Sequence, residues 1–372
     1  MAIRPGDIYK PRRKYGKAAT VVLMVIAALL LLAALLFNSF QKYIVYDPEG
    51  LRLELPFLTG NKADAAPGAD LPLTPDTPSA GDVDAEIVVV APDFSETDIG
   101  AGEGLSELRA VYISAENVSA EMLQTYAANL SGYGAEALLI EMKPDKGELV
   151  WASGVPTAMS FGVSGRQDLR EPIAQLKEQG IYLVAQISVC TDEYMAYRNP
   201  ALALRDSTGA VYANEAGTWL DPYNKHLRTY VSELMAELFA FGFDEIILAD
   251  LAHPNTEDTL LYSDPGSVVL DRVSCIANFA KAVTAPYIGT NKQVSVLCDA
   301  ASLRGDLSAG TGQDPEILAK FFDRLYVFSA AEYLSTDLPL LYEAVPEETA
   351  SRVVPITTAQ QPSGSWALRP WG

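Results

Sequence analysis

From about residue 108 onward, short apolar runs rich in Val, Ile and Tyr alternate with amphipathic stretches that have helical spacing. The runs typical of strands lie at 110–114, 137–142, 182–189, 245–250, 293–298, 324–328 and 352–357. Helical patterns lie between them at 120–130, 169–178, 226–241, 268–283, 315–324 and 338–344. This alternation predicts a parallel sheet, because each helix returns the chain to the start of the next strand.

Seven such units over about 250 residues fit a closed barrel better than an open doubly wound sheet, which remains the alternative. No clear eighth strand precedes the end of the chain, which reads SGSWALRPWG. We therefore predict an α/β fold, a (β/α)8 TIM-like barrel over 106–360, with a missing or irregular eighth strand. Residues 361–372 are predicted to form a tail that either leaves the barrel incomplete or closes it.

An unbroken apolar run occupies residues 18–37, with Thr20 as its one polar member. Its length matches the ~20 residues of a helix that spans a bilayer, and no cleavage site of small residues follows it. A buried core helix is the alternative, but the segment is apolar on all sides. We predict a single transmembrane helix at 18–40.

Six Lys and Arg residues precede the apolar run, and only Lys42 follows closely. The positive-inside rule therefore predicts a basic cytoplasmic tail at 1–17 and an extracytoplasmic position for everything after the helix. The predicted location is the cell membrane, crossed once.

Two segments precede the barrel. Residues 41–60 alternate apolar and polar side chains around the turn sequence DPEG, which predicts a short hairpin. Residues 61–105 are rich in Ala, Pro, Asp, Thr and Gly, which is typical of an acidic flexible linker.

Composition excludes several classes of partner. The formal net charge is −21, from 48 acidic and 27 basic residues, so nucleic acid would be repelled.

Three cysteines, Cys190, Cys275 and Cys298, form no disulfide framework, and two histidines are too few for a His-rich zinc site. No phosphate-binding, zinc-protease or nucleophile-elbow motif is present. We predict no metal and no cofactor, and neutral or cationic partners.

Functional residues of such a barrel lie where strands end. In LLIEMKPDKG, the charged residues Glu141, Lys143 and Asp145 share one parity, so they are predicted to face the barrel mouth. They form either a salt-bridged rim or the polar floor of a binding pocket. The next strand places Gln186 at the mouth in the same way.

The segment WLDPYN, at 219–224, offers apolar ring faces at Trp219 and Tyr223 and a hydrogen-bonding group at Asp221. This mixture suits a sugar, whose CH faces stack on aromatic rings while its hydroxyl groups need polar partners. The alternative is a structural loop in which Asp221 starts the turn into the following helix.

Carboxylates follow two neighbouring strands. The strand in GFDEIILADLAHP ends with Asp250 and His253, and the strand in QVSVLCDAAS ends with Asp299. Glycoside hydrolysis uses such a pair, one carboxylate as nucleophile or base and the other as proton donor. Glu332, after the sixth strand, is a substitute donor. Rim pairs and helix caps are the alternative roles for these residues.

The segments RAVYISA, LLIEMKPDKGEL, GIYLVAQISV, WLDPYN, GFDEII, VLCDAAS and TGQDPEILAKFFDRLYVFS resemble a bacterial family of glycoside-hydrolase-like barrels related to α-amylases. The resemblance covers about 109–360 and implies a (β/α)8 barrel that cleaves sugars, often behind a membrane anchor. It places Lys143 and Gly147 on a family turn, VKDxxG, whose Asp falls on Pro144. Trp219, Asp221, Pro222 and Tyr223 match the family's WxDPY loop, and Asp299 matches its fifth-strand Asp.

The resemblance weakens in the fourth strand, where the family pattern is approximately GFDEIQFDYVRFP. The family's Asp falls on Ala249, its Tyr on Asp250, its Arg on Ala252 and its Phe on His253, while an Arg of the third strand is replaced by Gln186. By strand parity Asp250 then faces the helices, as Ile246 and Leu248 do, unless a β-bulge reverses it.

Two functions remain open. The first is a membrane-anchored, extracytoplasmic glycoside-hydrolase-like barrel that acts on or binds cell-envelope carbohydrate. Asp250 and Asp299 would be catalytic, and the other residues named above would bind substrate. The alternative is a catalytically inactive barrel that serves as a glycan- or protein-binding module of the envelope.

Overall fold

The computed structural model describes residues 44–47, 50–53, 106–263, 271–299, 308–328 and 333–370. The predicted basic tail, transmembrane helix and linker lie outside these residues. Within the described part, no helix is long and apolar enough to cross a bilayer. Within the segment predicted to form a hairpin, β1 (Ile44–Asp47) pairs antiparallel with β2 (Gly50–Leu53).

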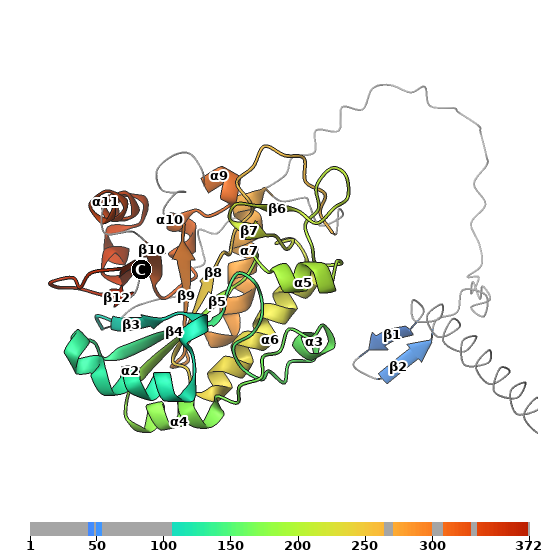
Figure 1. Ribbon diagram of the computed structural model, residues 1–372. Helices are drawn as coiled ribbons and strands as arrows, with labels where there is room; N and C mark the ends of the chain where they lie inside the picture. Colours follow the sequence, from blue (N-terminus) through green and yellow to red (C-terminus); the bar gives the residue numbers. More distant parts are fainter. Residues whose placement is uncertain are drawn as a thin grey trace, which may run out of the picture. The chain divides into compact units, whose positions relative to one another are not determined.

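Eight parallel strands form a closed barrel, which confirms the predicted fold class (Figure 1). They are β3 (Arg109–Ile113), β4 (Ala137–Lys143), β5 (Tyr182–Ser188), β8 (Glu245–Ala249), β9 (Gln293–Cys298), β10 (Leu325–Phe328), β11 (Val353–Thr357) and β12 (Trp366–Leu368). The strands are neighbours in chain order, and β12 closes the ring against β3.

The eighth strand lies within the predicted tail, so the barrel extends past residue 360. β12 has only three residues, all buried, and its Ala367 pairs with Ala110 of β3. No helix lies between β11 and β12 in the described residues, in contrast to the strand–helix rhythm of the preceding units. Residues Trp366–Leu368, within the segment predicted to be a tail, therefore close the barrel.

Helices surround the strands. The longer ones are α2 (Ala120–Tyr133), α4 (Arg170–Glu178), α6 (Lys225–Phe241), α7 (Arg272–Thr284) and α11 (Leu334–Ala344). Shorter ones are α3 (Pro156–Ser160), α5 (Glu193–Arg198), α9 (Ser308–Thr311) and α10 (Pro315–Leu318). A short antiparallel hairpin, β6 (Ala213–Asn214) and β7 (Gly217–Thr218), lies between β5 and α6.

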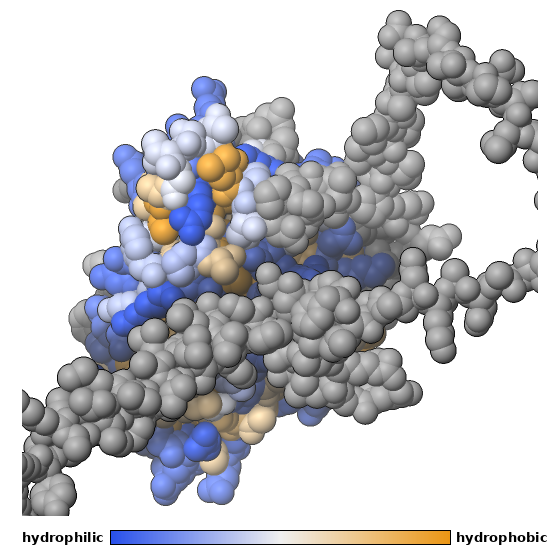
Figure 2. Space-filling view, turned by 90° about the vertical axis from the view of Figure 1, so that its right-hand side faces the viewer, coloured by the Kyte–Doolittle hydropathy of each residue, from blue (hydrophilic) through white to orange (hydrophobic). Residues whose placement is uncertain are grey.

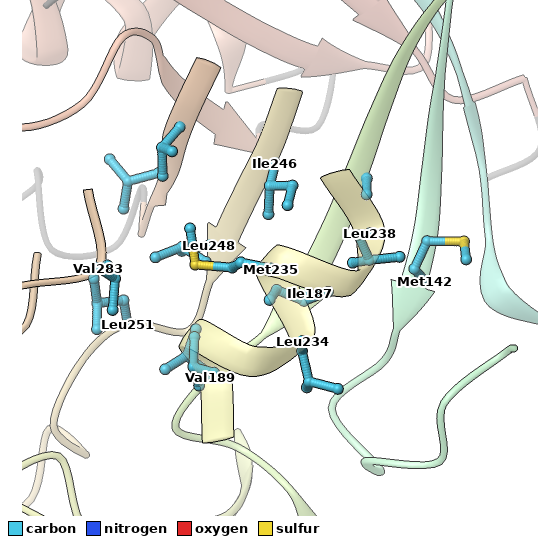
Figure 3. Close-up of a cluster of buried hydrophobic side chains, with 14 of the residues drawn as sticks. Met142, Ile187, Val189, Leu234, Met235, Leu238, Ile246, Leu248, Leu251 and Val283 are labelled. Carbon is cyan, nitrogen blue, oxygen red and sulfur yellow. The ribbon is translucent and has the colours of Figure 1, made fainter. Parts of the chain in front are cut away.

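The strands are apolar on both faces, which explains why their sequences are almost continuous apolar runs. On the outer face, Leu234, Met235 and Leu238 of α6 pack toward Ile187 and Leu248 of the strands (Figure 3). A second cluster fills the barrel interior, with Tyr112, Leu139, Val184, Ile247 and Ile356 among its members. Side chains of one parity therefore face the interior, and those of the other face the helices.

Exposed apolar side chains are scattered over the described part of the barrel. Large ones with substantial exposure are Met159, Tyr197, Leu261, Ile288, Phe328, Tyr333 and Tyr342. Where described residues are visible in Figure 2, the surface is mainly hydrophilic, with small separate apolar areas.

Candidate functional site

A cavity of about 570 Å³ lies where β8, β9 and β10 end. Its lining comes from the β6–β7 hairpin and from the segments after these strands: Asn214, Glu215, Ala216, Trp219, Asp250, Ala252, His253, Asn255, Leu297, Cys298, Asp299, Thr311, Gln313 and Phe328. Four residues singled out from the sequence, Trp219, Asp250, His253 and Asp299, thus share one cavity.

Asp250 reaches this cavity through an unusual backbone conformation. It follows directly after β8, and its φ of 53° makes it the one non-glycine residue with positive φ in the described chain. Such a conformation costs of order 1–3 kcal/mol for a residue other than glycine, and Asp tolerates it better than most. Strand parity alone would turn Asp250 toward the helices. A left-handed residue, and not the β-bulge we considered, turns it toward the mouth.

Two hydroxyl groups hold the Asp250 carboxylate. Ser188 Oγ and Thr191 Oγ1 donate to Asp250 Oδ2 at 2.6 and 2.9 Å. Ser188 ends β5 on the face that points to the barrel interior, and Thr191 lies three residues further along. The sequence places Ser188 on the same strand face as Gln186 but assigns no role to Ser188 or Thr191, because both contacts depend on how Asp250 turns.

Asp299 follows β9 and is exposed at the cavity. Its backbone N–H donates to Gln313 Oε1 at 2.9 Å. The Gln313 amide donates in turn to the carbonyl groups of Leu251 and Leu297, both at 3.3 Å. Gln313 therefore ties together the two segments that carry Asp250 and Asp299. Sequence analysis missed it because it comes from a distant segment.

Two aromatic rings line the cavity in different ways. Trp219 is almost fully buried, and its indole N–H donates to Asn214 Oδ1 at 2.8 Å, so the ring secures the β6–β7 hairpin. Phe328, the last residue of β10, is 42% exposed. Phe328 is therefore the more accessible surface for a sugar ring. It shares the inward parity of Tyr326, which is the sequence signal that could have identified it.

His253 lines the same cavity from a fully buried position. Neither ring nitrogen has a hydrogen-bond partner among the described residues, and the Tyr223 ring lies 5.1 Å away. Burial, with a contribution from the Arg272 guanidinium, lowers the pKa of His253 to about 3. The imidazole is therefore neutral at physiological pH.

This neutral histidine predicts acid sensitivity. His253 of the unfolded chain binds a proton below pH ~6.5, whereas the folded chain binds it only below about pH 3. The free energy of unfolding therefore falls as the pH falls from ~6.5 toward 3. Between pH 7 and pH 5 the expected loss from this residue is about 2 kcal/mol. His253→Phe should reduce the pH dependence by that amount in denaturant unfolding measured at both pH values.

His226→Gln, at an exposed position on α6, is the matched control for this measurement. A His253→Phe protein with the same pH dependence as the unsubstituted chain would show that the histidine is protonated in the folded state.

Asp221 and Tyr223 do not line the cavity. Asp221 is fully buried, and its carboxylate accepts hydrogen bonds from the Tyr223 N–H at 2.9 Å and from the N–H and hydroxyl groups of Ser263, both at 2.7 Å. These contacts fit the alternative role predicted for Asp221, that of a structural residue in the turn before α6. The Tyr223 ring lies 5.1 Å from the ring of His253, which lines the cavity, and 5.0 Å from the ring of Tyr262.

Lys143 belongs to a buried ion pair at the rim. Its Nζ lies 2.9 Å from Asp192 Oδ2 and donates to the Ser188 carbonyl at 2.7 Å. The pairing of β4 with β5 shifts between Glu141 and Lys143, which changes the direction of Lys143. Gly147 makes room for the pair, since a Cβ there would lie 1.7 Å from Asp192 Oδ1. Burial raises the pKa of Asp192, and Lys143 opposes that rise.

Glu141 and Gln186 are partners in the β4–β5 register at the mouth and do not line the cavity. Glu141 is partly buried and accepts hydrogen bonds from the Ala115 N–H, at 2.9 Å, and from Tyr112, while burial raises its pKa. Gln186 is buried, and its Oε1 has no partner in the described residues. Asp145 is exposed. Glu332 lies outside the described residues.

A closed parallel barrel with carboxylates at its carboxyl-terminal face is the architecture of many sugar-cleaving enzymes. Residues 110–335 match a family described as "Putative glycosyl hydrolase domain". The chain belongs to this family. No curated protein matches the chain.

Several solved structures are similar to this chain, and one of them, that of PgaB, has a TM-score above 0.5. The glycoside hydrolase domain of PgaB (BpsB) from Bordetella bronchiseptica is 16% identical, with a TM-score of 0.52, over 68% of this chain and 84% of that domain. A hypothetical protein from Ruminiclostridium thermocellum is 22% identical, with a TM-score of 0.43, over 50% of this chain and 96% of that one. The GH20 β-N-acetylhexosaminidase of Streptomyces coelicolor is 11% identical, with a TM-score of 0.43, over 68% and 47%.

Proposed function

We propose that this protein is a membrane-anchored glycoside hydrolase that acts on carbohydrate of the cell envelope, outside the cytoplasm. The observation that carries the proposal is the shared cavity, which Asp250, Asp299 and the exposed Phe328 all line. One carboxylate would act as nucleophile or base and the other would donate a proton to the leaving oxygen. Phe328 would stack on a sugar ring.

The membrane location is supported by the sequence of the first 42 residues, in which a basic stretch precedes an apolar run of bilayer length. The composition supports an uncharged or cationic substrate, because a chain with a formal net charge of −21 repels polyanions. Neutral glycans or glycans with free amino groups therefore fit better than acidic wall polymers.

The activity is tested by incubating the purified chain with a panel of envelope glycans that includes peptidoglycan, and measuring soluble product and binding. We expect release of reducing sugar from at least one polymer. Neither product nor binding with any member of the panel would contradict the proposal.

The location is tested separately with a reporter enzyme that is active only outside the cytoplasm, fused after residue 372. We expect reporter activity in the full chain and its loss when residues 18–40 are deleted. Activity that does not depend on these residues would contradict the predicted anchor.

The second candidate is a catalytically inactive barrel that binds a glycan or an envelope protein. It is favoured by Ala249, which stands where the resemblance places the family's fourth-strand Asp, and by the two hydroxyl groups that occupy Asp250 Oδ2. Saturable glycan binding without product, unchanged by Asp250→Asn, would favour this candidate.

A further inference from the structure

One short segment connects the two sides of the cavity. Residues 188–192 begin at the last residue of β5 and lie between the end of β8 and the β6–β7 hairpin. On one side, the N–H groups of Val189 and Cys190 donate to the carbonyl groups of Ala249 and Asp250 at 2.9 and 3.1 Å. The position of Asp250 is therefore tied to this segment through its backbone.

On the other side, the same segment pairs with the hairpin region. The Leu220 N–H donates to the Cys190 carbonyl at 2.7 Å, and the Asp192 N–H donates to the Thr218 carbonyl at 2.9 Å. Thr191 forms an antiparallel bridge with Trp219. The segment thus sets where the carboxylate lies relative to the hairpin that covers the cavity.

The side chains of Ser188 and Thr191 complete this link. Their hydroxyl oxygens lie 2.6 Å apart, and each is within hydrogen-bond distance of the same carboxylate oxygen, Asp250 Oδ2. Each hydroxyl group has one proton to donate to Oδ2, and the Thr191 carbonyl oxygen, 2.9 Å from Ser188 Oγ, is a further acceptor for the Ser188 proton. Oδ1 is then the carboxylate oxygen that makes no hydrogen bond within the described residues. One oxygen of Asp250 is held, and the other is left for a ligand in the cavity.

The segment itself is firmly held. At its first residue, the Ser188 carbonyl accepts the hydrogen bond from Lys143, and at its last residue, Asp192 is the buried ion-pair partner of the same lysine. One buried lysine thus contacts both ends of the segment, a carbonyl group at Ser188 and a carboxylate at Asp192, which restricts how far the two hydroxyl groups can move. The hydroxyl groups of Ser188 and Thr191 therefore belong to a rigid segment, and a rigid segment is what positioning of a reactive group requires.

We propose that Ser188 and Thr191 are positioning residues, which fix the Asp250 carboxylate so that Oδ1 faces the ligand. This inference rests on the proposed function, in which Asp250 acts on a bound sugar. The left-handed backbone brings the carboxylate to the mouth, and the two hydroxyl groups then select its orientation.

A structural measurement tests the inference without any substrate. In crystal structures of the purified protein, Ser188→Ala combined with Thr191→Val should release the Asp250 side chain from its present position, whereas Thr191→Ser should leave it in place. An Asp250 carboxylate that keeps its orientation in the double variant would overturn the inference. This result would not depend on whether the protein cleaves any glycan.

A kinetic measurement separates positioning from a general role in stability. With a glycan that the protein cleaves, Thr191→Val should lower kcat about 10- to 100-fold with a much smaller change in KM, because a misplaced reactive group slows chemistry more than binding. Thr191→Ser should restore most of the loss. Thr229→Val, which removes an exposed hydroxyl group on α6, is the matched control.

Equal losses in Thr191→Val and Thr191→Ser, or a loss that follows thermal stability alone, would also overturn the positioning role. Absence of cleavage and binding in the unsubstituted protein would contradict the proposed function instead, and the crystal structures would still decide the inference.

Discussion

Arg324→Met lowers the free energy of unfolding by about 3–5 kcal/mol, because it leaves the carboxylate of Glu245 buried without its cation. The two side chains are 3% and 0% exposed, and Arg324 Nη1 lies 2.5 Å from Glu245 Oε2. Glu245 begins β8 and faces the barrel interior, at the end opposite to the cavity. Urea unfolding of the variant and of the unsubstituted protein measures the difference.

Glu245 has further partners that make its charge hard to replace. Ser295 and Tyr326 donate to its Oε1 at 2.6 and 2.9 Å, and Tyr182 donates to Oε2 at 3.1 Å. These donors come from β9, β10 and β5, so the network joins strands around the barrel. Loss of the arginine therefore leaves a buried anion held by hydroxyl groups alone, which explains the size of the expected effect.

A matched control separates burial from charge. Arg170→Met removes an arginine whose side chain is 58% exposed and whose nearest carboxylate, Asp168, lies 3.7 Å away. The expected change is less than about 1 kcal/mol. A comparably small change for Arg324→Met would show that Glu245 is neutralised or hydrated without its partner.

Asp250→Asn reduces glycan cleavage by about 10²–10⁴-fold while leaving the fold intact. The substitution keeps the size of the side chain and an oxygen that can accept from Ser188 and Thr191, but it removes the charge that a nucleophile or base needs. Product release from the glycan cleaved most rapidly gives the rate, and isothermal titration gives the affinity. Affinity should change much less than rate, because stacking on Phe328 remains.

Asp206→Asn, on an exposed loop outside this cavity, is the control for removal of one negative charge. Full cleavage by Asp250→Asn would contradict the catalytic role of this residue. Binding without cleavage in both the unsubstituted protein and the variant would instead support the non-catalytic alternative.

Most of the barrel could be predicted from the sequence because its strands are buried on both faces. Seven apolar runs of four to seven residues stand out between amphipathic helices, and their observed bounds differ from the predicted ones by no more than one residue. β12 was not predicted, since three residues are too few to show a period and no helix precedes them. β12 is stabilised by its pairing with β3, which comes from the other end of the barrel sequence, and no local pattern reveals that pairing.

The candidate site could be predicted only in part. Asp250 and Asp299, chosen because they follow strand ends, line one cavity, because parallel strands bring their carboxyl ends to one face. The direction of Asp250 depends on one left-handed φ angle, which no residue pattern reveals. Strand parity predicted that Lys143 faces the mouth. In the structure the β4–β5 register shifts before Lys143, and Lys143 forms a buried ion pair with Asp192, which is distant in sequence.

The central claim is that the cavity at the ends of β8, β9 and β10 is a carbohydrate site. A crystal structure of the protein with a bound oligosaccharide from the panel tests it most directly. We expect a sugar ring against Phe328, with a sugar hydroxyl group that donates a hydrogen bond to Asp250 Oδ1. An ordered oligosaccharide elsewhere on the barrel, with this cavity empty, would contradict the claim.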